Sequence, residues 1–133
     1  MCLIRERGAR DGQSGMTLLE LLIVLLIIGL VMAVAYPLYT GYLESARRTD
    51  AKSALVDIAG RLERCYTLNQ TYQGCVDDLD RGMESAKGFY EIQASLEAST
   101  YTLIASPQGA QENDSCGELT LTQSGNEAPK ACW

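Results

Sequence analysis

The chain has 133 residues and a formal net charge of −6, with 11 Lys and Arg against 17 Asp and Glu. A chain of this length forms one domain with a modest core, which leaves little room for a second, catalytic domain. The acidic balance argues weakly against a general nucleic-acid binder, because phosphate binding needs a basic face. The sequence contains no His, so the usual proton-transfer residue and metal ligand is missing.

A short polar leader precedes a long apolar segment. Residues 1 to 15 are weakly basic and end in Gln13-Ser14-Gly15. From Met16 to Tyr39 the only charged side chain is Glu20. A helix of that length spans about 36 Å, enough to cross the hydrocarbon core of a bilayer with some tilt. The segment must therefore contact lipid or other apolar helices.

The apolar segment also contains a candidate site for secretory signal cleavage. Ala33-Val34-Ala35 has the required small-residue pattern and stands directly before Tyr36. Against cleavage there, the apolar run is longer than the usual core of a signal peptide, and it carries Glu20 almost at its start. Acids inside membrane segments are functional candidates by default, because a carboxylate in hydrocarbon is costly. The alternative for Glu20 is a position at headgroup depth.

The residues around Gly15 resemble the class III signal of type IV pilins and of the related pseudopilins. The run from Gly15 through Met16 and Glu20 to Gly29 is similar to that family's leader ending in Gly, apolar first mature residue, early Glu and unbroken apolar stretch. The resemblance implies cleavage between Gly15 and Met16 by a prepilin peptidase, and N-methylation of Met16. It also implies a role in assembly for Glu20, by pairing with the N-terminal amine of a neighbouring subunit. Met16 departs from the pattern, since the first mature residue is usually Phe.

The resemblance continues through Ala35-Tyr36-Pro37, where the exposed half of the family's long helix begins. We therefore expect Pro37 inside a helix, where it removes one backbone donor and bends the helix near Ala33. Gly29 is a second weak point, at about 1 kcal/mol relative to Ala in a regular helix. The alternative is a helix that ends at Tyr36.

An amphipathic helical pattern follows the apolar segment. Its apolar stripe has helical spacing and consists of Ala51, Ala54, Leu55, Ile58, Leu62 and Cys65. Most charged residues fall off this stripe, so one face should cover a globular partner and the other should meet solvent or neighbours. The charges from Glu44 to Arg48 are interpreted as a solvated face, with a phosphate-binding patch as the alternative.

The rest of the chain predicts a small sheet. Residues 67–87 show turn formers without a sustained period and are predicted to form a crossing loop. Alternation over residues 90–96 and 101–105 predicts a hairpin, and alternation over residues 118–122 predicts a third strand. The sequence also allows a short fourth strand near Ala131. A sheet with one apolar face needs the helix stripe to cover it. The predicted fold class is α+β: a long N-terminal α-helix packed on a small antiparallel β-sheet, the type IV pilin fold.

The cysteines indicate disulfides. Of the five, Cys2 lies in the leader and the others form an even set in the exported part, namely Cys65, Cys75, Cys116 and Cys132. Disulfides are favoured over a zinc site or free thiols, because the domain is expected to be exported and no C-x2-C pair occurs. The region of Cys116 and Cys132 looks like the disulfide-closed C-terminus of pilins, and its ending resembles the small minor pilins called PilE. Closing that loop contributes about 3 kcal/mol, and Cys65 is expected to pair with Cys75.

No catalytic set presents itself. The sequence lacks a Gly-rich phosphate loop and recognisably paired carboxylates, so no enzyme activity and no cofactor are predicted. A calcium loop is not predicted, because the stretch Glu112-Asn113-Asp114 has too few oxygen ligands for one. No other metal site is predicted.

The resemblance implies a structural subunit of a type IV pilus, a minor pilin by its length and ending, serving pilus biogenesis, motility, adhesion or DNA uptake. The alternatives are a type II secretion pseudopilin and an exported domain released near Ala35. The implied partners are other pilin subunits, prepilin peptidase, the inner membrane and its pilus assembly machinery, while nucleic acid stays open.

The implied organisation has three parts. Residues 1–15 form a removed leader, residues 16–39 the transmembrane and assembly half of the helix, and residues 40–133 a periplasmic globular domain. The resemblance places the precursor in the bacterial inner membrane, with its C-terminus in the periplasm, and the assembled subunit in a pilus on the cell surface.

Overall fold

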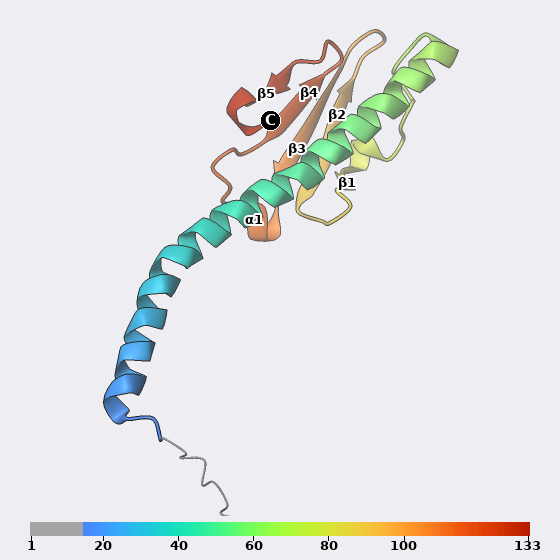
Figure 1. Cartoon of the computed structure of the whole chain (residues 1–133). Helices are drawn as coiled ribbons and strands as arrows, with labels where there is room; N and C mark the ends of the chain where they lie inside the picture. The colour runs from blue at the N-terminus through green and yellow to red at the C-terminus, as the bar shows by residue number, and fades with distance from the viewer. Residues whose placement is uncertain (1–14) are drawn as a thin grey trace, which may run out of the picture. The chain divides into compact units, whose positions relative to one another are not determined.

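The computed structural model describes residues 15–133, so Cys2 and most of the expected leader lie outside the described residues. The chain divides into two compact units, one reaching to Leu38 and the other running from Tyr39 to Trp133. Helix α1 (Leu18–Asn69) contributes residues to both units (Figure 1). Pro37 lies inside α1, so the alternative in which the helix ends at Tyr36 is wrong.

The described part of the first unit is the apolar portion of α1. Thr17 caps the start of the helix: its hydroxyl oxygen accepts a hydrogen bond from the Glu20 N–H at 3.2 Å, and its carbonyl accepts one from the Leu21 N–H at 3.2 Å. The helix is long and apolar enough to cross a membrane. Length and hydropathy thus agree with the expectation of a membrane span.

The second unit contains an antiparallel sheet with the strand order β1-β2-β3-β4-β5. Its strands are β1 (Met83–Glu84), β2 (Tyr90–Leu96), β3 (Tyr101–Pro107), β4 (Leu119–Thr122) and β5 (Glu127–Ala128). The central register pairs Ala94 with Leu103, and Leu103 with Leu121. The predicted hairpin and third strand are therefore confirmed.

The core of this unit lies between the sheet and the part of α1 that crosses it (Figure 1). The helix contributes Ala51, Leu55, Ile58 and Leu62, and the sheet contributes Tyr90, Ile92, Leu103, Ala105, Leu119 and Leu121. Burying one large aliphatic side chain of this kind contributes about 1.5–3 kcal/mol. The expectation that the helix stripe covers the apolar face of the sheet is confirmed.

The expected loop over residues 67–87 is wrong in part. Helix α1 continues to Asn69, a short 3-10 helix η1 (Leu79–Arg81) follows, and β1 then pairs with β2 through Met83 and Ile92. A strand as short as β1 has no alternation to detect. It forms here because the chain turns at Gly82, whose φ of 79° is one that side-chain-bearing residues rarely adopt.

The short strand after β4 exists, but it lies earlier in the chain than the position near Ala131 that the sequence allows. The last strand, β5, ends at Ala128, and residues Lys130–Cys132 form a 3-10 helix, η3. Pro129 stands between them and has no N–H to donate to a neighbouring strand. A further 3-10 helix, η2 (Gly109–Gln111), interrupts the loop that leads from β3 to β4.

Candidate functional site

The expected cleavage position lies directly before α1, where the described residues have no regular secondary structure. Gly15 and Met16 are both exposed, and Met16 is 64% exposed. A side chain added at Gly15 would meet no described atom within 4 Å. Both residues that flank the expected cleaved bond are therefore exposed to solvent.

Glu20 occupies the first turn of α1, three residues after Thr17. The sequence Thr17-Leu18-Leu19-Glu20 has the spacing of a capping box, in which the acid also lies at the positive end of the helix dipole. The bond from the Glu20 N–H to the Thr17 hydroxyl provides half of that motif. Sequence reasoning missed this local role, although the Thr-x-x-Glu spacing was available to show it.

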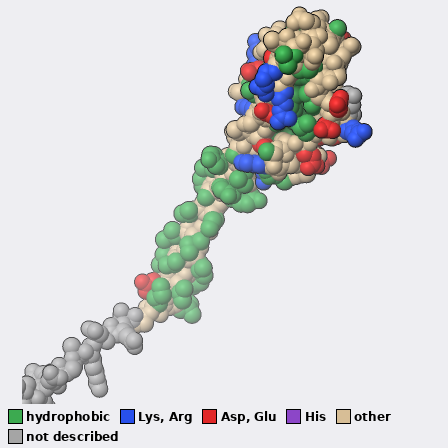
Figure 2. All heavy atoms as spheres, turned by 90° about the vertical axis from the view of Figure 1, so that its right-hand side faces the viewer, with side chains coloured by type: hydrophobic (Ala, Val, Ile, Leu, Met, Phe, Trp, Pro, Cys, Tyr) green, Lys and Arg blue, Asp and Glu red, His purple; other side chains and the backbone are tan. Residues whose placement is uncertain are grey.

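The helix surface that follows Glu20 is apolar on all sides. Described residues from Leu18 to Leu38 are exposed, and Figure 2 shows hydrophobic side chains along this segment. A helix that is hydrophobic all round is stable only in lipid or among other helices. Gly29 lies within this surface, and a side chain added there would meet nothing within 4 Å.

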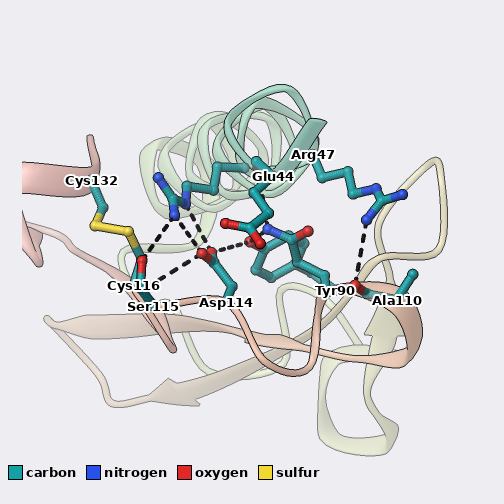
Figure 3. Close-up of polar contacts among 10 residues, drawn as sticks. Glu44, Arg47, Tyr90, Ala110, Asp114, Ser115, Cys116 and Cys132 are labelled. Atoms are coloured by element: carbon teal, nitrogen blue, oxygen red, sulfur yellow. Dashed lines mark hydrogen bonds and ion pairs between the residues drawn. A yellow bond between two sulfur atoms is a disulfide. The ribbon is translucent and has the colours of Figure 1, made fainter. Parts of the chain in front are cut away.

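An ion pair in the second unit joins α1 to the loop before β4 (Figure 3). Arg48 donates from Nε to Oδ2 of Asp114 at 2.8 Å and from a terminal nitrogen to the other carboxylate oxygen. The Asp114 side chain is completely buried. The guanidinium of Arg48 lowers the pKa of Asp114 from 3.8 to about 2, against the opposing effect of burial.

Tyr90 and Gln111 extend this cluster. The Tyr90 hydroxyl donates to Asp114 at 3.2 Å, and burial raises the pKa of Tyr90 to about 12. The Gln111 amide nitrogen donates to the Glu44 carbonyl at 3.1 Å and lies 3.2 Å from the Tyr90 hydroxyl. The loop carrying Gln111 and Asp114 is thus fixed to α1 at two points.

Arg47 adds a third contact with the same loop. It donates to the Ala110 carbonyl at 3.4 Å, and its guanidinium lies 4.7 Å from the centre of the Phe89 ring. The interpretation of Glu44 to Arg48 as a solvated face is therefore wrong for Arg47 and Arg48. These two residues dock the loop, and their partners lie too far away in the sequence for a local pattern to reveal them.

The second unit contains two disulfides, one at the end of α1 and one near the C-terminus. Cys65 pairs with Cys75, which ties the last turns of α1 to the following loop, and Cys116 pairs with Cys132. Both pairings are those expected from the sequence. The second bridge encloses β4, β5 and η3, and between Gln123 and Lys130 every residue of this closed loop is exposed. The surface between Cys116 and Cys132 is thus held at both ends and open to a partner.

The Lys and Arg side chains of the second unit fall into two groups. Some form a hydrogen bond or ion pair, and those that form neither over residues 15–133 are called unengaged. Arg47 and Arg48 dock the loop, and Arg61 forms an ion pair with Asp57 at 2.9 Å. Over residues 15–133, no hydrogen bond or ion pair is formed by the side chains of Lys52, Arg64, Arg81, Lys87 and Lys130. In the same range, no group of His, Cys, Asp and Glu is arranged to hold a metal ion.

Comparison with known proteins decides the family. Residues 37–120, more than half of the chain, match the sequence model of a family described as the type IV minor pilin ComP, DNA uptake sequence receptor. The chain belongs to this family of type IV minor pilins. Residues 10–36 match the prokaryotic N-terminal methylation motif. The minor pilin thus carries the two sequence signatures of the family in the expected order.

Solved structures agree with this assignment. A type IV pilin from Shewanella oneidensis shares 28% identity with this minor pilin, over 68% of this chain and 97% of that one, at a TM-score of 0.51. The non-core minor pilin PilV of Neisseria meningitidis is 18% identical over 65% of this chain and 86% of that one, at a TM-score of 0.54, and shows the fold. The α+β pilin fold is confirmed.

The assignment fixes the general role. This minor pilin is a structural subunit of a type IV pilus, and it assembles with other pilin subunits after processing by a prepilin peptidase. Before assembly it is anchored in the bacterial inner membrane by its apolar helix, and afterwards it is part of the surface pilus. The pseudopilin and the released exported domain are therefore set aside.

Proposed function

We propose that this minor pilin binds DNA at the pilus surface, as a receptor for DNA uptake sequences. The observation that carries the proposal is the match of residues 37–120 to the family described as a DNA uptake sequence receptor. The protein acts by binding and assembly and has no catalytic activity. The pilus assembly machinery of the inner membrane is its further partner.

DNA binding by this chain depends on a local site, because the net charge of −6 repels phosphate. The side chain of Lys130 is exposed and has no partner in the described part of the chain. It lies in the loop closed by Cys116 and Cys132, together with the exposed amides of Gln123 and Asn126. A cation can contact phosphate while amides can bond to base edges.

The turn that carries Asn126 is held by its own hydrogen bonds. The Asn126 N–H donates to the Thr122 hydroxyl at 3.2 Å, the Asn126 amide nitrogen lies 3.1 Å from the Ser124 hydroxyl, and the Gly125 N–H donates to the Thr122 carbonyl at 2.9 Å. A side chain presented on a fixed turn loses less conformational entropy on binding. This arrangement supports sequence-selective contact by Asn126.

The proposal is tested with mature protein in detergent micelles and a pool of random-sequence DNA duplexes, enriched by repeated binding and then sequenced. We expect a short recurring sequence to be enriched. Lys130→Gln should weaken binding to all duplexes and lower the salt dependence by about one released counterion. Lys52→Gln is the matched control, because it removes a different unengaged cation, one that lies on α1 and outside the closed loop. Failure of the native protein to retain any duplex at low salt would contradict the proposal.

The proposed precursor has three parts. Residues 1–15 are the leader, cleaved between Gly15 and Met16, residues 16–39 serve membrane insertion and assembly, and residues 40–133 form the exported domain. The Glu20 side chain takes part in assembly through the amine of a neighbouring subunit. The capping contact at the start of α1 uses the backbone N–H of Glu20 and the Thr17 hydroxyl, so it leaves the Glu20 carboxylate available for that pairing.

A further inference from the structure

A groove runs between α1 and the edge strand β1 in the second unit. It has a volume of about 370 Å³. Its apolar lining includes Ile58, Met83 and Ile92, and its acidic lining consists of Asp50, Asp57 and Glu84. Figure 2, which views the side of the molecule on which β1 lies, shows hydrophobic side chains between acidic and basic ones. The groove therefore combines an apolar surface with negative charge.

Asp50 is the unusual member of this lining. It is only 8% exposed, and both carboxylate oxygens share one donor, the Lys87 backbone N–H, at 3.3 Å each. Within residues 15–133, no cation forms an ion pair with Asp50. Buried carboxylates are ordinarily paired, because an unpaired buried charge is costly. The single chain thus leaves Asp50 without a counter-charge.

The other two acids of the groove, unlike Asp50, are exposed to solvent. Asp57 is exposed and already pairs with Arg61 at 2.9 Å. Glu84 is exposed and accepts a hydrogen bond from the Gln108 amide at 3.4 Å. Both add negative potential around Asp50 without neutralising it. A ligand that satisfies the groove must bring an apolar stem and a positive end.

Lysine and arginine side chains have this construction, with an aliphatic stem below a charged head. We propose that the groove receives a Lys or Arg side chain from an adjacent pilin subunit, with Asp50 as its buried counter-charge. The stem would contact Ile58, Met83 and Ile92, and the head would lie near the carboxylates. DNA is an unsuitable occupant, because the acids repel phosphate.

The geometry of a pilus explains why a subunit would carry an acidic groove. Subunits that repeat along a helical filament meet head to tail, so each contact joins two different surfaces. An acidic groove on one subunit therefore needs a basic surface on its neighbour. This chain itself exposes such cations, because the side chains of Arg64, Arg81 and Lys130 are exposed and unengaged in its described part. Complementary charge also selects the correct neighbour, since a wrong pairing leaves Asp50 buried and unpaired.

The first test replaces Asp50 with Asn. An Asn side chain still accepts the Lys87 N–H but removes the charge, so the Tm of the mature monomer in detergent should stay unchanged or rise. The amount of subunit in sheared pili should fall by about tenfold or more, because truncating one partner of a buried charge pair is costly. Glu118→Gln is the control, since Glu118 is an exposed acid outside the groove. It should assemble like the native subunit.

The outcomes of this test separate the alternatives. Parallel loss of Tm and of assembly in Asp50→Asn would show that Asp50 serves only the fold of its own chain, and would overturn the proposal. Assembly at the native level would overturn it as well. The DNA-binding measurement on monomers is independent of either result, so failure of the groove and failure of the DNA proposal are distinguishable.

A second test identifies the occupant. Ala86 lines the groove and is exposed, so a photo-crosslinking benzoylphenylalanine at this position reaches whatever enters it. In assembled pili we expect a crosslink to a pilin peptide that contains Lys or Arg next to the crosslinked site. A crosslink to DNA, to a protein other than a pilin or to a pilin peptide without a basic residue would overturn the proposal. So would the absence of any crosslink from labelled subunits present in the pili.

Discussion

Arg48 and Asp114 form a two-point ion pair that fixes the loop before Cys116 to helix α1. The same carboxylate accepts from the Tyr90 hydroxyl at 3.2 Å and from the Cys116 N–H at 3.4 Å. One buried side chain thus joins the helix, the sheet and the start of the disulfide-closed surface. The orientation of that surface depends on the charge of Asp114.

The first prediction concerns acid stability. The folded state holds the pKa of Asp114 at about 2, below its ordinary value of 3.8. A lowered carboxyl pKa stabilises the fold above the unfolded-state value, and this contribution is lost as the pH falls through the folded-state value. We therefore expect the second unit to lose on the order of 2 kcal/mol between about pH 4 and pH 2. Thermal unfolding by circular dichroism over this range measures the loss.

Asp114→Asn isolates this contribution. The variant should be less stable near neutral pH, since Arg48 keeps its charge without a partner, and it should lack the acid-dependent step of the native protein. Glu118→Gln, which changes an exposed acid bonded to Ser106, should keep that step. An unchanged acid profile in Asp114→Asn would assign the loss of stability to another carboxylate.

The second prediction concerns the disulfides. Peptide mapping without reduction should recover Cys65 linked to Cys75, and Cys116 linked to Cys132. Cys132→Ser should lower the free energy of unfolding by about 3 kcal/mol, because the bridge spans a sequence separation of 16 residues. A peptide that links Cys65 to Cys116, or free thiols in the purified mature protein, would refute the connectivity.

The sequence predicts those parts of the fold whose signal is local. Strand β2 was predictable from Tyr90 to Leu96, because alternation over that length indicates which face is buried. The apolar stripe on α1 was predictable for the same reason, at helical spacing. The span before Tyr39 was predictable from length and hydropathy alone. Each of these features repeats along neighbouring residues.

The features that were missed depend on partners far away in the chain. Arg48 and Asp114 are 66 residues apart, so nothing near Arg48 distinguishes a docking residue from a solvated one. Strand β1 exists because its two residues pair with β2, and the buried Asp50 accepts its hydrogen bond from Lys87, 37 residues further along the chain. Such contacts form only when distant parts of the same chain fold together. The local signal that was overlooked is the Thr-x-x-Glu spacing from Thr17 to Glu20.

The third prediction concerns processing. Gly15→Leu should block removal of the leader, because the prepilin signal that these residues resemble has a leader ending in Gly, and residues 10–36 match the N-terminal methylation motif. Mass spectrometry of the mature N-terminus in cells that contain prepilin peptidase should find methylated Met16 in the native chain only. A start at Met16 in the variant would refute the site, and a start at Tyr36 in the native chain would indicate signal peptidase cleavage.

The fourth prediction separates two roles of Glu20. Its backbone N–H takes part in the helix cap by donating to the Thr17 hydroxyl, and its side-chain charge can pair with the amine of a neighbouring subunit. Glu20→Gln keeps the capping spacing, since Gln serves at this position as well as Glu, but removes the charge. Thr17→Ala keeps the charge and removes the hydroxyl that accepts the Glu20 N–H, at a cost of about 1 kcal/mol.

If assembly depends on the charge, Glu20→Gln and Glu20→Ala should both leave processing, membrane insertion and the disulfides intact while lowering the amount of subunit in sheared pili. Thr17→Ala should assemble close to the native level. The physical reason is that a carboxylate within an apolar helix costs about 2–3 kcal/mol toward the bilayer centre and less near the surface, so storage in the membrane gains nothing from Glu20. Pairing with an amine offsets that cost only in the filament. The reverse pattern, with Thr17→Ala excluded from pili and Glu20→Gln incorporated normally, would show that assembly depends on the helix cap at Thr17 and not on the charge of Glu20.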